Sequence, residues 1–189
     1  NKWIKSIQHQ TDRLARLTER LVFLTRMDEE NNPIMEKRDM DLSNAVVEMA
    51  DGYLAMVKSK GRKLAIDVED GIRLTADEAM MRQVVSLLLD NAMKYSSEGG
   101  NVELALKRDG QRVLLTVSNS VEEGAVTEGA HPEFFDRFYR ADQSRNTGKG
   151  RGSFGIWLSV VEAVVDGHKG KISADCHNNC VVITTKLPL

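Results

Sequence analysis

The chain has 189 residues, 41% of them apolar and 29% charged, which is enough for one hydrophobic core and a short accessory element. Its formal net charge of −2 provides no basic field, so no nucleic-acid partner is expected. The sequence has no run of about 18 apolar residues and no signal-peptide pattern, so we expect this stretch of chain to be soluble.

Residues 1–28 predict a helix with a narrow apolar stripe. The stripe consists of Ile7, Leu14, Leu17, Leu21 and Leu24. This spacing is typical of a coiled-coil seam, which is too narrow to form a core alone. We therefore expect the helix to pack with a partner helix and with a second copy of itself. The alternative is a helix lying on its own domain.

A polar linker is expected at 29–40, where Pro33 breaks the heptad pattern. The globular domain is predicted to span 41–189. Its first helix is expected to be capped by Ser43 and to end at Gly61, where a left-handed residue closes helices.

A short strand is predicted over 63–68, followed by a second helix. Thr75 and Glu78 form a capping-box pattern at its start, and the apolar spacing continues to about Tyr95. The inward residues of this helix are expected to be Met81, Val84, Val85, Leu88 and Leu89.

The second half of the domain predicts two hairpins and a helix. Alternating runs at 101–107 and 112–118 flank Asp109-Gly110, runs at 171–176 and 181–186 flank Asn178-Asn179, and a helix is expected at 154–165. Segregated helices and antiparallel strands predict an α+β fold, with one helical layer on one sheet. Residues 120–152 are too long for an idle loop and predict a functional lid.

Cys176 and Cys180 admit two interpretations. With His177 they could ligate a metal, but Asn178-Asn179 has the composition of a hairpin turn and the sequence has no second ligand pair. Reduced cytosolic thiols are therefore favoured.

Asn91, Lys94 and Tyr95 sit at positions i, i+3 and i+4 and therefore share one helical face. An amide oxygen, an ammonium and a phenol ring suit a metal ion, a phosphate and a base or ribose. The alternative is a solvated helix end.

Three further segments carry candidate chemistry. Asn119 ends a predicted strand that runs into Gly124, and its side chain could bond an adenine edge, although such a sequence is also typical of a plain turn. Residues 132–140 gather three Phe and a Tyr. Arg140 and Arg145 could meet phosphate charge there, or they could be surface arginines beside a satellite apolar cluster.

Residues 148–155 form a glycine-rich stretch that leads into the helix expected at 154–165. Glycines let backbone amides approach a polyphosphate, Lys149 and Arg151 would neutralise it, and the helix dipole would add to the attraction. Because no strand precedes the stretch, it matches neither the Rossmann fingerprint nor the P-loop.

In this order, the four segments resemble the N, G1, F and G2 boxes of the ATPase domain of two-component sensor histidine kinases, in the GHKL superfamily. The likeness covers about residues 41–189 and includes Leu-Leu-Asp-Asn-Ala-Met-Lys-Tyr-Ser, Phe-Asp-Arg-Phe-Tyr-Arg-Ala-Asp-Gln-Ser-Arg and Gly-His-Lys-Gly-Lys-Ile. Residues 1–28 resemble the second helix of the family's dimerisation and phosphotransfer domain. The resemblance implies a two-layer, Bergerat-type ATP-binding fold.

The resemblance also implies a cofactor and a site. Magnesium would be bound through Asn91, Lys94 would lie near the phosphates, and a lid would cover 141–152. The residues expected to bind ATP are Asn91, Lys94, Tyr95, Asn119, Gly124, Tyr139, Arg140, Arg145, Lys149, Gly150, Gly152, Gly155, Ile156 and Leu158.

The family's phosphoacceptor histidine lies in the preceding helix, in a segment resembling Ser-His-Glu-Leu-Arg-Thr-Pro, and this string does not occur here. None of His9, His131, His168 and His177 is expected to be phosphorylated. The chain is expected to be a fragment of a homodimeric kinase that phosphorylates a response-regulator receiver domain. It would be the cytoplasmic part of a protein anchored in the bacterial inner membrane by segments upstream.

Two departures from the family pattern leave alternatives open. Asn119 replaces the usual Asp, and Trp157 stands in the run that is usually Gly-Leu-Gly-Leu, which favours a catalytically weak or non-enzymatic signalling module. A hydrolytic ATPase of the same superfamily is disfavoured, because Leu87 occupies the position of the water-activating carboxylate and Asp90 lies about 100° round the helix from Asn91.

Overall fold

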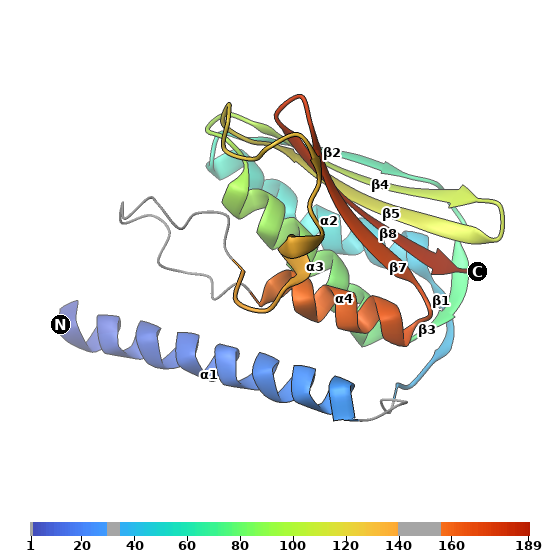
Figure 1. Cartoon of the computed structure of the whole chain (residues 1–189), viewed down its shortest axis with the longest axis horizontal. Helices are drawn as coiled ribbons and strands as arrows, with labels where there is room; N and C mark the ends of the chain where they lie inside the picture. Colours follow the sequence, from blue (N-terminus) through green and yellow to red (C-terminus); the bar gives the residue numbers. More distant parts are fainter. Residues whose placement is uncertain (1, 30–34, 140–155) are drawn as a thin grey trace.

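The computed structural model describes residues 2–29, 35–139 and 156–189, and shows a sheet covered on one face by helices (Figure 1). Its elements are α1 (Lys2–Glu29), β1 (Arg38–Asp41), α2 (Leu42–Ser59), β2 (Lys63–Val68), β3 (Arg73–Ala76), α3 (Glu78–Tyr95), β4 (Asn101–Asp109), β5 (Arg112–Ser120), β6 (Gly129–Ala130), the 3₁₀ helix η1 (Pro132–Phe135), α4 (Trp157–Gly167), β7 (Lys171–His177) and β8 (Cys180–Pro188). The predicted α+β, two-layer arrangement is confirmed.

The main sheet has six strands in the order β2-β4-β5-β8-β7-β6. Both predicted hairpins are present, as the antiparallel pairs β4–β5 and β7–β8. The expectation of antiparallel strands holds for the other pairs of this sheet but not for β2, which runs parallel to β4. The chain between these two strands contains α3, and a long crossover of this kind allows a parallel pair. The small antiparallel sheet of β1 and β3 was not predicted, since each strand has only four residues.

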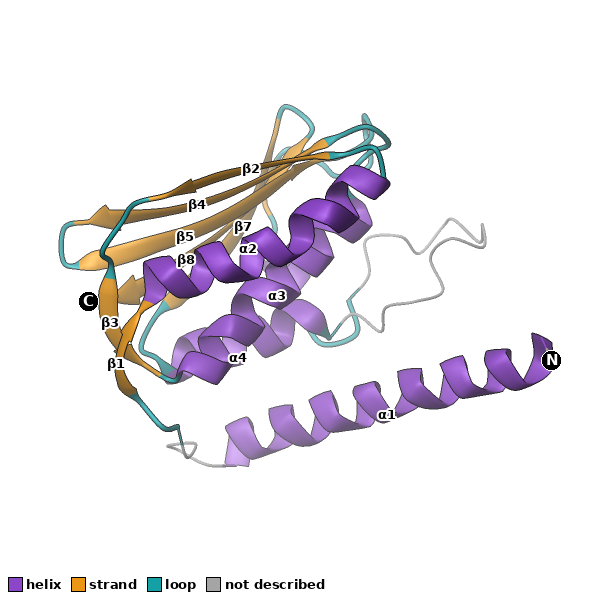
Figure 2. Cartoon of the chain, turned by 180° about the vertical axis from the view of Figure 1, so that it is seen from behind, coloured by secondary structure: helices purple, strands orange, loops and turns teal. Residues whose placement is uncertain are grey.

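The core lies between the sheet and a layer formed by α2, α3 and α4 (Figure 2). The apolar stripe predicted for α3 is buried as expected, with Met81, Val84, Val85, Leu88 and Leu89 at most 1% exposed. Leu104 and Leu115 contribute from β4 and β5, and Val160 and Val164 from α4. Burying an aliphatic side chain of this size stabilises the fold by roughly 1.5–3 kcal/mol, so α3 is held mainly by its packed face.

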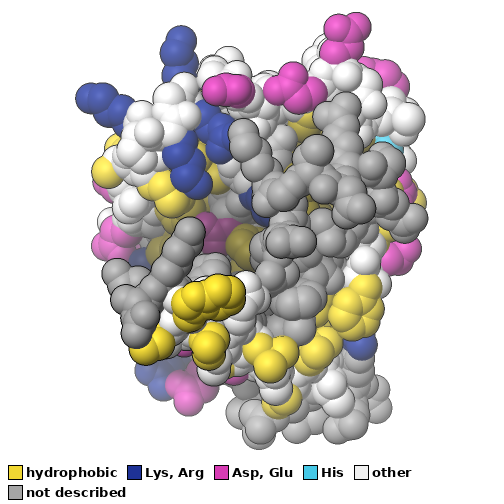
Figure 3. All heavy atoms as spheres, turned by 90° about the vertical axis from the view of Figure 1, so that its left-hand side faces the viewer, with side chains coloured by type: hydrophobic (Ala, Val, Ile, Leu, Met, Phe, Trp, Pro, Cys, Tyr) yellow, Lys and Arg dark blue, Asp and Glu magenta, His cyan; other side chains and the backbone are white. Residues whose placement is uncertain are grey.

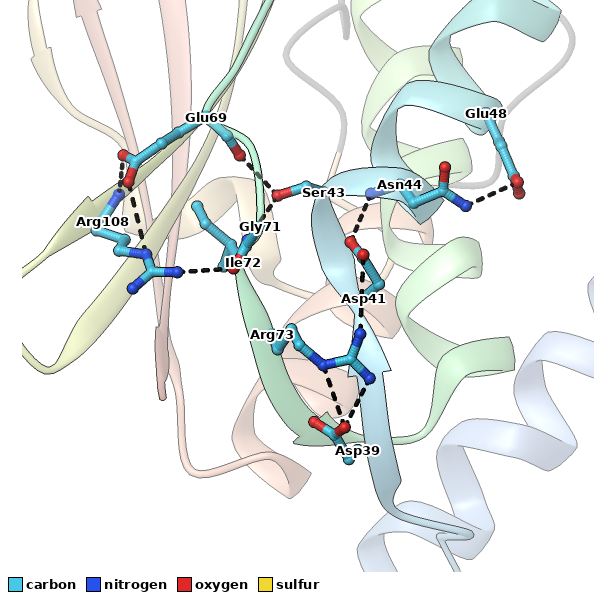
Figure 4. Close-up of polar contacts among 10 residues, drawn as sticks. All are labelled: Asp39, Asp41, Ser43, Asn44, Glu48, Glu69, Gly71, Ile72, Arg73 and Arg108. Carbon is cyan, nitrogen blue, oxygen red and sulfur yellow. Dashed lines mark hydrogen bonds and ion pairs between the residues drawn. The ribbon is translucent and has the colours of Figure 1, made fainter.

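The start of α2 differs from the prediction, because its N-cap is Asp41 and not Ser43. The Asp41 carboxylate accepts a hydrogen bond of 2.9 Å from the amide of Asn44. The Ser43 hydroxyl instead donates to the Glu69 carbonyl at 2.6 Å and accepts from the amide of Ile72 at 2.9 Å (Figure 4). Ser43 therefore fastens α2 to the segment between β2 and β3.

The start of α3 also differs, since the N-cap is Asp77 and the predicted capping box is absent. The Asp77 carboxylate accepts from the amide of Met80 at 3.1 Å, and Thr75 belongs to β3. Asp77 also accepts from the amide of Glu36 at 3.0 Å. The cap is therefore Asp77, whereas the local sequence pattern predicted Thr75. Asp77 also makes a long-range contact, with Glu36.

The helix expected at 1–28 is present as α1, and its apolar stripe is partly exposed. Trp3 is 81% exposed and Ile7 66%, whereas Leu24 is 1% exposed and packs into the core near α4. Apolar side chains gather low on the face where the N-terminal end of α1 lies (Figure 3). None of the helices among the described residues is both long and apolar enough to cross a bilayer. Self-association through α1 stays a prediction.

Candidate functional site

The first predicted motif, Asn91 with Lys94 and Tyr95, lies in the last two turns of α3. The stripe that faces the sheet leaves Asn91, Lys94 and Tyr95 on another side of the helix, with Asn91 and Lys94 partly buried and Tyr95 40% exposed. The Lys94 ammonium lies 4.9 Å from the centre of the Tyr95 ring, a cation–π distance. Lys94 and Tyr95 are therefore in contact, and Asn91 lies one turn before Lys94 in the same helix.

The Lys94 ammonium is buried and has no hydrogen-bond partner among the described residues. A buried charge without a partner is costly, and the ring of Tyr95 satisfies none of its three N–H groups. An anion held at this place would supply the missing acceptors. Lys94 is therefore a buried cation at the end of α3 whose hydrogen-bonding capacity the described residues leave unfilled.

The end of β5 presents Asn119, the second predicted motif. Its side chain is 4% exposed, and its amide nitrogen donates to the Ser120 carbonyl at 3.3 Å. Gly124 follows in an exposed turn with a φ of +71°, a left-handed conformation that suits glycine. Asn119 is a buried amide at the strand end, unlike the side chain of an exposed turn.

The aromatic segment adopts a short 3₁₀ helix, η1, beside β6. Phe135 is buried, Phe134 is half-buried, and Phe138 is 59% exposed with a φ of +67°. Phe134 stacks on His131 with ring centres 4.7 Å apart and lies 5.9 Å from Tyr139. The prediction that some of these aromatics are buried is confirmed, because Phe135 belongs to the main core and Phe134 packs against it.

His131 anchors this aromatic segment through both ring nitrogens. Nδ1 lies 2.7 Å from a carboxylate oxygen of Glu133, and Nε2 lies 2.7 Å from the carbonyl of Thr127. Both partners are acceptors, so the doubly protonated ring fits best. The hydrogen bond to Glu133 accordingly raises the pKa of His131, and the same bond lowers the pKa of Glu133.

The fourth predicted motif is described only from Ile156 onward. Ile156 is the N-cap of α4, which begins at Trp157 and not at residue 154. Ile156 and Leu158 are buried in the core, and Trp157 packs half-buried against the same core. The other predicted site residues of the glycine-rich and arginine segments lie outside the described residues: Arg140, Arg145, Lys149, Gly150, Gly152 and Gly155.

Two polar contacts around α3 were missed in the sequence. The Tyr53 hydroxyl in α2 donates to the Asp90 carboxylate at 2.8 Å and lies 2.9 Å from the hydroxyl of Ser86. Burial raises the pKa of Tyr53 to about 12, so the phenol stays protonated. The guanidinium of Arg62 contacts the C-terminal end of α3, where it donates to the Ser96 carbonyl. Neither pairing has a local sequence signal, because each joins residues more than 30 positions apart.

The cysteines lie on the β7–β8 hairpin, and both thiols are free. Asn178 and Asn179 form its turn with φ values of +52° and +59°, as the sequence predicted. Burial raises the pKa of the Cys176 thiol. Within the described residues, no group of three or more His, Cys, Asp or Glu side chains could hold a metal ion.

The fold is an α+β domain in which the buried Lys94 ammonium lies at the end of α3. The sequence model of the family described as "Histidine kinase-, DNA gyrase B-, and HSP90-like ATPase" matches residues 76–189. The chain therefore belongs to this ATPase family.

Known sensor proteins and solved structures agree with this assignment. The chain is 33% identical over 175 residues to the sensor histidine kinase CusS of Escherichia coli K12, covering 91% of this chain and 35% of CusS. Full-length ShkA in complex with AMPPNP superposes with a TM-score of 0.79 at 19% identity, covering 99% of this chain and 38% of ShkA. Histidine kinase ThkA in complex with the response regulator protein TrrA gives a TM-score of 0.71 at 19% identity, covering 97% of this chain and 50% of that one. The chain spans less than half the length of the curated relatives it matches.

Proposed function

We propose that this chain is the ATP-binding, catalytic part of a sensor histidine kinase. The observation that carries the proposal is the buried Lys94 ammonium, which lacks an acceptor at the end of the helix that also bears Asn91. A polyphosphate would supply that acceptor. The membership of the ATPase family and the relatedness to sensor histidine kinases support a nucleotide as the anion.

The residues present fit Mg-ATP, which when bound supplies the phosphoryl group for transfer. The Asn91 side-chain oxygen would ligate magnesium, because hard divalent cations prefer oxygen ligands. Lys94 would neutralise phosphate charge, and Asn119 would bond the adenine edge. Tyr95, Gly124 and Tyr139 border the same ligand in this proposal. Most of the catalysis is then positioning and charge stabilisation.

The rest of the predicted site completes the proposal. Arg140, Arg145, Lys149, Gly150, Gly152 and Gly155 would line the phosphates under a lid at 141–152, and Ile156 and Leu158 would contribute backbone only. The acceptor is a histidine on a dimerisation bundle that includes residues 1–28. Residues 29–40 link this helix to the catalytic domain at 41–189. The phosphohistidine would then supply a response-regulator aspartate, a partnership supported by the ThkA–TrrA complex.

The parent protein in this proposal is a homodimer anchored in a bacterial inner membrane, and this chain is part of its cytoplasmic region. Its relatedness to sensor kinases such as CusS and BaeS supports that placement.

A hydrolytic ATPase is the weaker candidate. Leu87, one turn before Asn91, is buried in the core and offers no base. The Asp90 carboxylate accepts a hydrogen bond of 2.8 Å from the Tyr53 hydroxyl, so it serves the packing of α2 on α3. In a non-enzymatic module, weak nucleotide binding would be due to Asn119. The other departure from the family pattern, Trp157, packs against the core.

The test is calorimetric titration of the chain with a non-hydrolysable ATP analogue and Mg²⁺. Micromolar to submillimolar binding is expected, and Asn91→Ala and Lys94→Met should each weaken it by about tenfold, or about 1.4 kcal/mol. Lys107→Met is the matched control, because Lys107 is exposed and pairs with Asp67 at 2.6 Å. Absence of binding up to millimolar nucleotide would refute the proposal and favour the non-enzymatic module.

A further inference from the structure

Arg62 lies between α2 and β2, where the chain reverses. Gly61 has a left-handed φ of +66°, and the Arg62 amide donates to the Val57 carbonyl at 3.1 Å. This turn directs the Arg62 side chain across to the C-terminal end of α3. Its guanidinium is partly buried there.

The guanidinium binds three carbonyls at the end of α3. One terminal nitrogen donates to Ser96 at 2.8 Å, the other donates to Met93, and Nε donates to Ser97 at 3.4 Å. The last carbonyls of a helix lack partners within it, and the helix dipole attracts positive charge at that end. Arg62 satisfies both requirements with one rigid, planar group.

The segment after α3 is bonded in turn to the end of β5. The Ser97 amide donates to the Ser120 carbonyl at 2.9 Å, and the two hydroxyls lie 3.1 Å apart. The Ser120 hydroxyl also accepts from the Asn101 amide at 3.0 Å, and the Ser120 carbonyl accepts from Asn119. One continuous hydrogen-bond network therefore runs from Arg62 through Ser97 and Ser120 to Asn119.

We propose that Arg62 is a positioning residue for nucleotide binding. It fixes the last turns of α3, which carry Asn91 and Lys94, relative to the end of β5, which carries Asn119. The inference rests on the proposed function, since these three side chains are the ones assigned to Mg-ATP. Arg62 contacts backbone carbonyls of α3 and its following segment, and so acts through the placement of its neighbours.

Arg62→Lys tests this role while keeping the charge. An ammonium on a flexible stem cannot replace a fork that bonds three separate carbonyls. We expect Kd for a non-hydrolysable ATP analogue with Mg²⁺ to rise by about fivefold to tenfold, with the thermal midpoint close to that of the wild type. Arg38→Lys is the matched control, because Arg38 is exposed and pairs with exposed Glu36 at 3.2 Å; it should leave Kd unchanged.

A double-mutant cycle separates positioning from general destabilisation. Asn91→Ala should weaken binding by a smaller factor in the Arg62→Lys background than in the wild type, because Asn91 is already misplaced there. Equal factors in both backgrounds, or wild-type affinity for Arg62→Lys, would overturn the inference. The wild-type Kd tests the proposed function separately, since a wild type that binds no nucleotide refutes that function and this inference with it.

Ser120→Ala provides a second route if Arg62→Lys does not fold. It removes the hydroxyl that joins Ser97 to Asn101 and leaves the Arg62 contacts in place. A rise in Kd of about threefold is expected, again with smaller factors for Asn91→Ala. A folded Ser120→Ala variant with wild-type affinity would show that the Ser120 hydroxyl transmits no position to the site, since the bond from the Ser97 amide to the Ser120 carbonyl is retained.

Discussion

His168 joins the end of α4 to the start of α3, and its replacement should destabilise the fold in a pH-dependent way. Its side chain is buried, Nε2 accepts from the Asp77 amide at 3.0 Å, and Nδ1 lies 2.7 Å from the Val164 carbonyl. This geometry requires a neutral ring with the proton on Nδ1. Burial correspondingly lowers the pKa of His168, and the nearby Lys37 charge acts in the same direction.

His168→Ala should lower the free energy of unfolding by about 2–4 kcal/mol near pH 7.5. The two lost hydrogen bonds account for about 1 kcal/mol each. The Asp77 amide, left without its acceptor, adds about 1–3 kcal/mol, and this penalty is reduced where water hydrogen-bonds to the amide. Urea titration followed by circular dichroism measures the difference. His177→Ala is the control, because His177 is exposed on the β7–β8 turn; it should change stability by less than about 0.5 kcal/mol.

The pH dependence gives the sharper test. The pKa of His168 is lower in the folded state than in the unfolded state, so the unfolded chain binds a proton on this ring at a pH where the folded chain does not. The free energy of unfolding of the wild type therefore falls as pH drops below about 6.5. Alanine cannot titrate, so the gap between wild type and His168→Ala should narrow toward acid pH. If the difference in free energy of unfolding between wild type and His168→Ala stays constant, or widens, as pH falls from about 8 to about 5, the assignment of a neutral His168 ring is refuted.

Three further outcomes are expected from urea titrations. Tyr53→Phe should cost about 1–2 kcal/mol through the lost bonds to α3, and an unchanged midpoint would show that water replaces them. Asp77→Ala should cost about 1 kcal/mol or more and Thr75→Ala much less, with the reverse order contradicting the cap seen here. The raised pKa of His131 stabilises the fold below about pH 6.5, and this contribution is lost as pH rises through the folded-state value. Glu133→Gln should reduce the loss of stability with rising pH, and an unaltered profile of unfolding free energy against pH would contradict the assignment of a protonated His131 bonded to Glu133.

The sequence predicted those features that depend on local pattern. Asp109-Gly110 marked the β4–β5 turn, the apolar spacing marked the buried face of α3, and the helical pattern put Asn91, Lys94 and Tyr95 in the last turns of that helix. Each follows from the geometry of one element and its neighbours along the chain. The same local rules identified the motif residues of the candidate site.

Features that depend on distant residues could not be predicted in this way. Asp41 and Ser43 are both good capping residues, and the choice was decided by Glu69 and Ile72, which engage the Ser43 hydroxyl. The burial of the Lys94 ammonium and the reach of Arg62 to Ser97 likewise arise only when α2, α3 and β5 have packed. The parallel orientation of β2 and β4 is allowed by the long crossover between them, which contains α3.

That parallel pair also has a consequence for the order in which the chain folds. β2 and β4 cannot align until the whole segment of β3 and α3 has compacted between them, and such non-local pairing is slow compared with hairpin closure. The β4–β5 and β7–β8 hairpins can form early, whereas β2 joins the sheet only over a docked α3. Substitutions that loosen α3 should therefore retard refolding more than substitutions in either hairpin turn. The helix that carries the candidate site is thus also needed for the late step in which β2 joins the sheet.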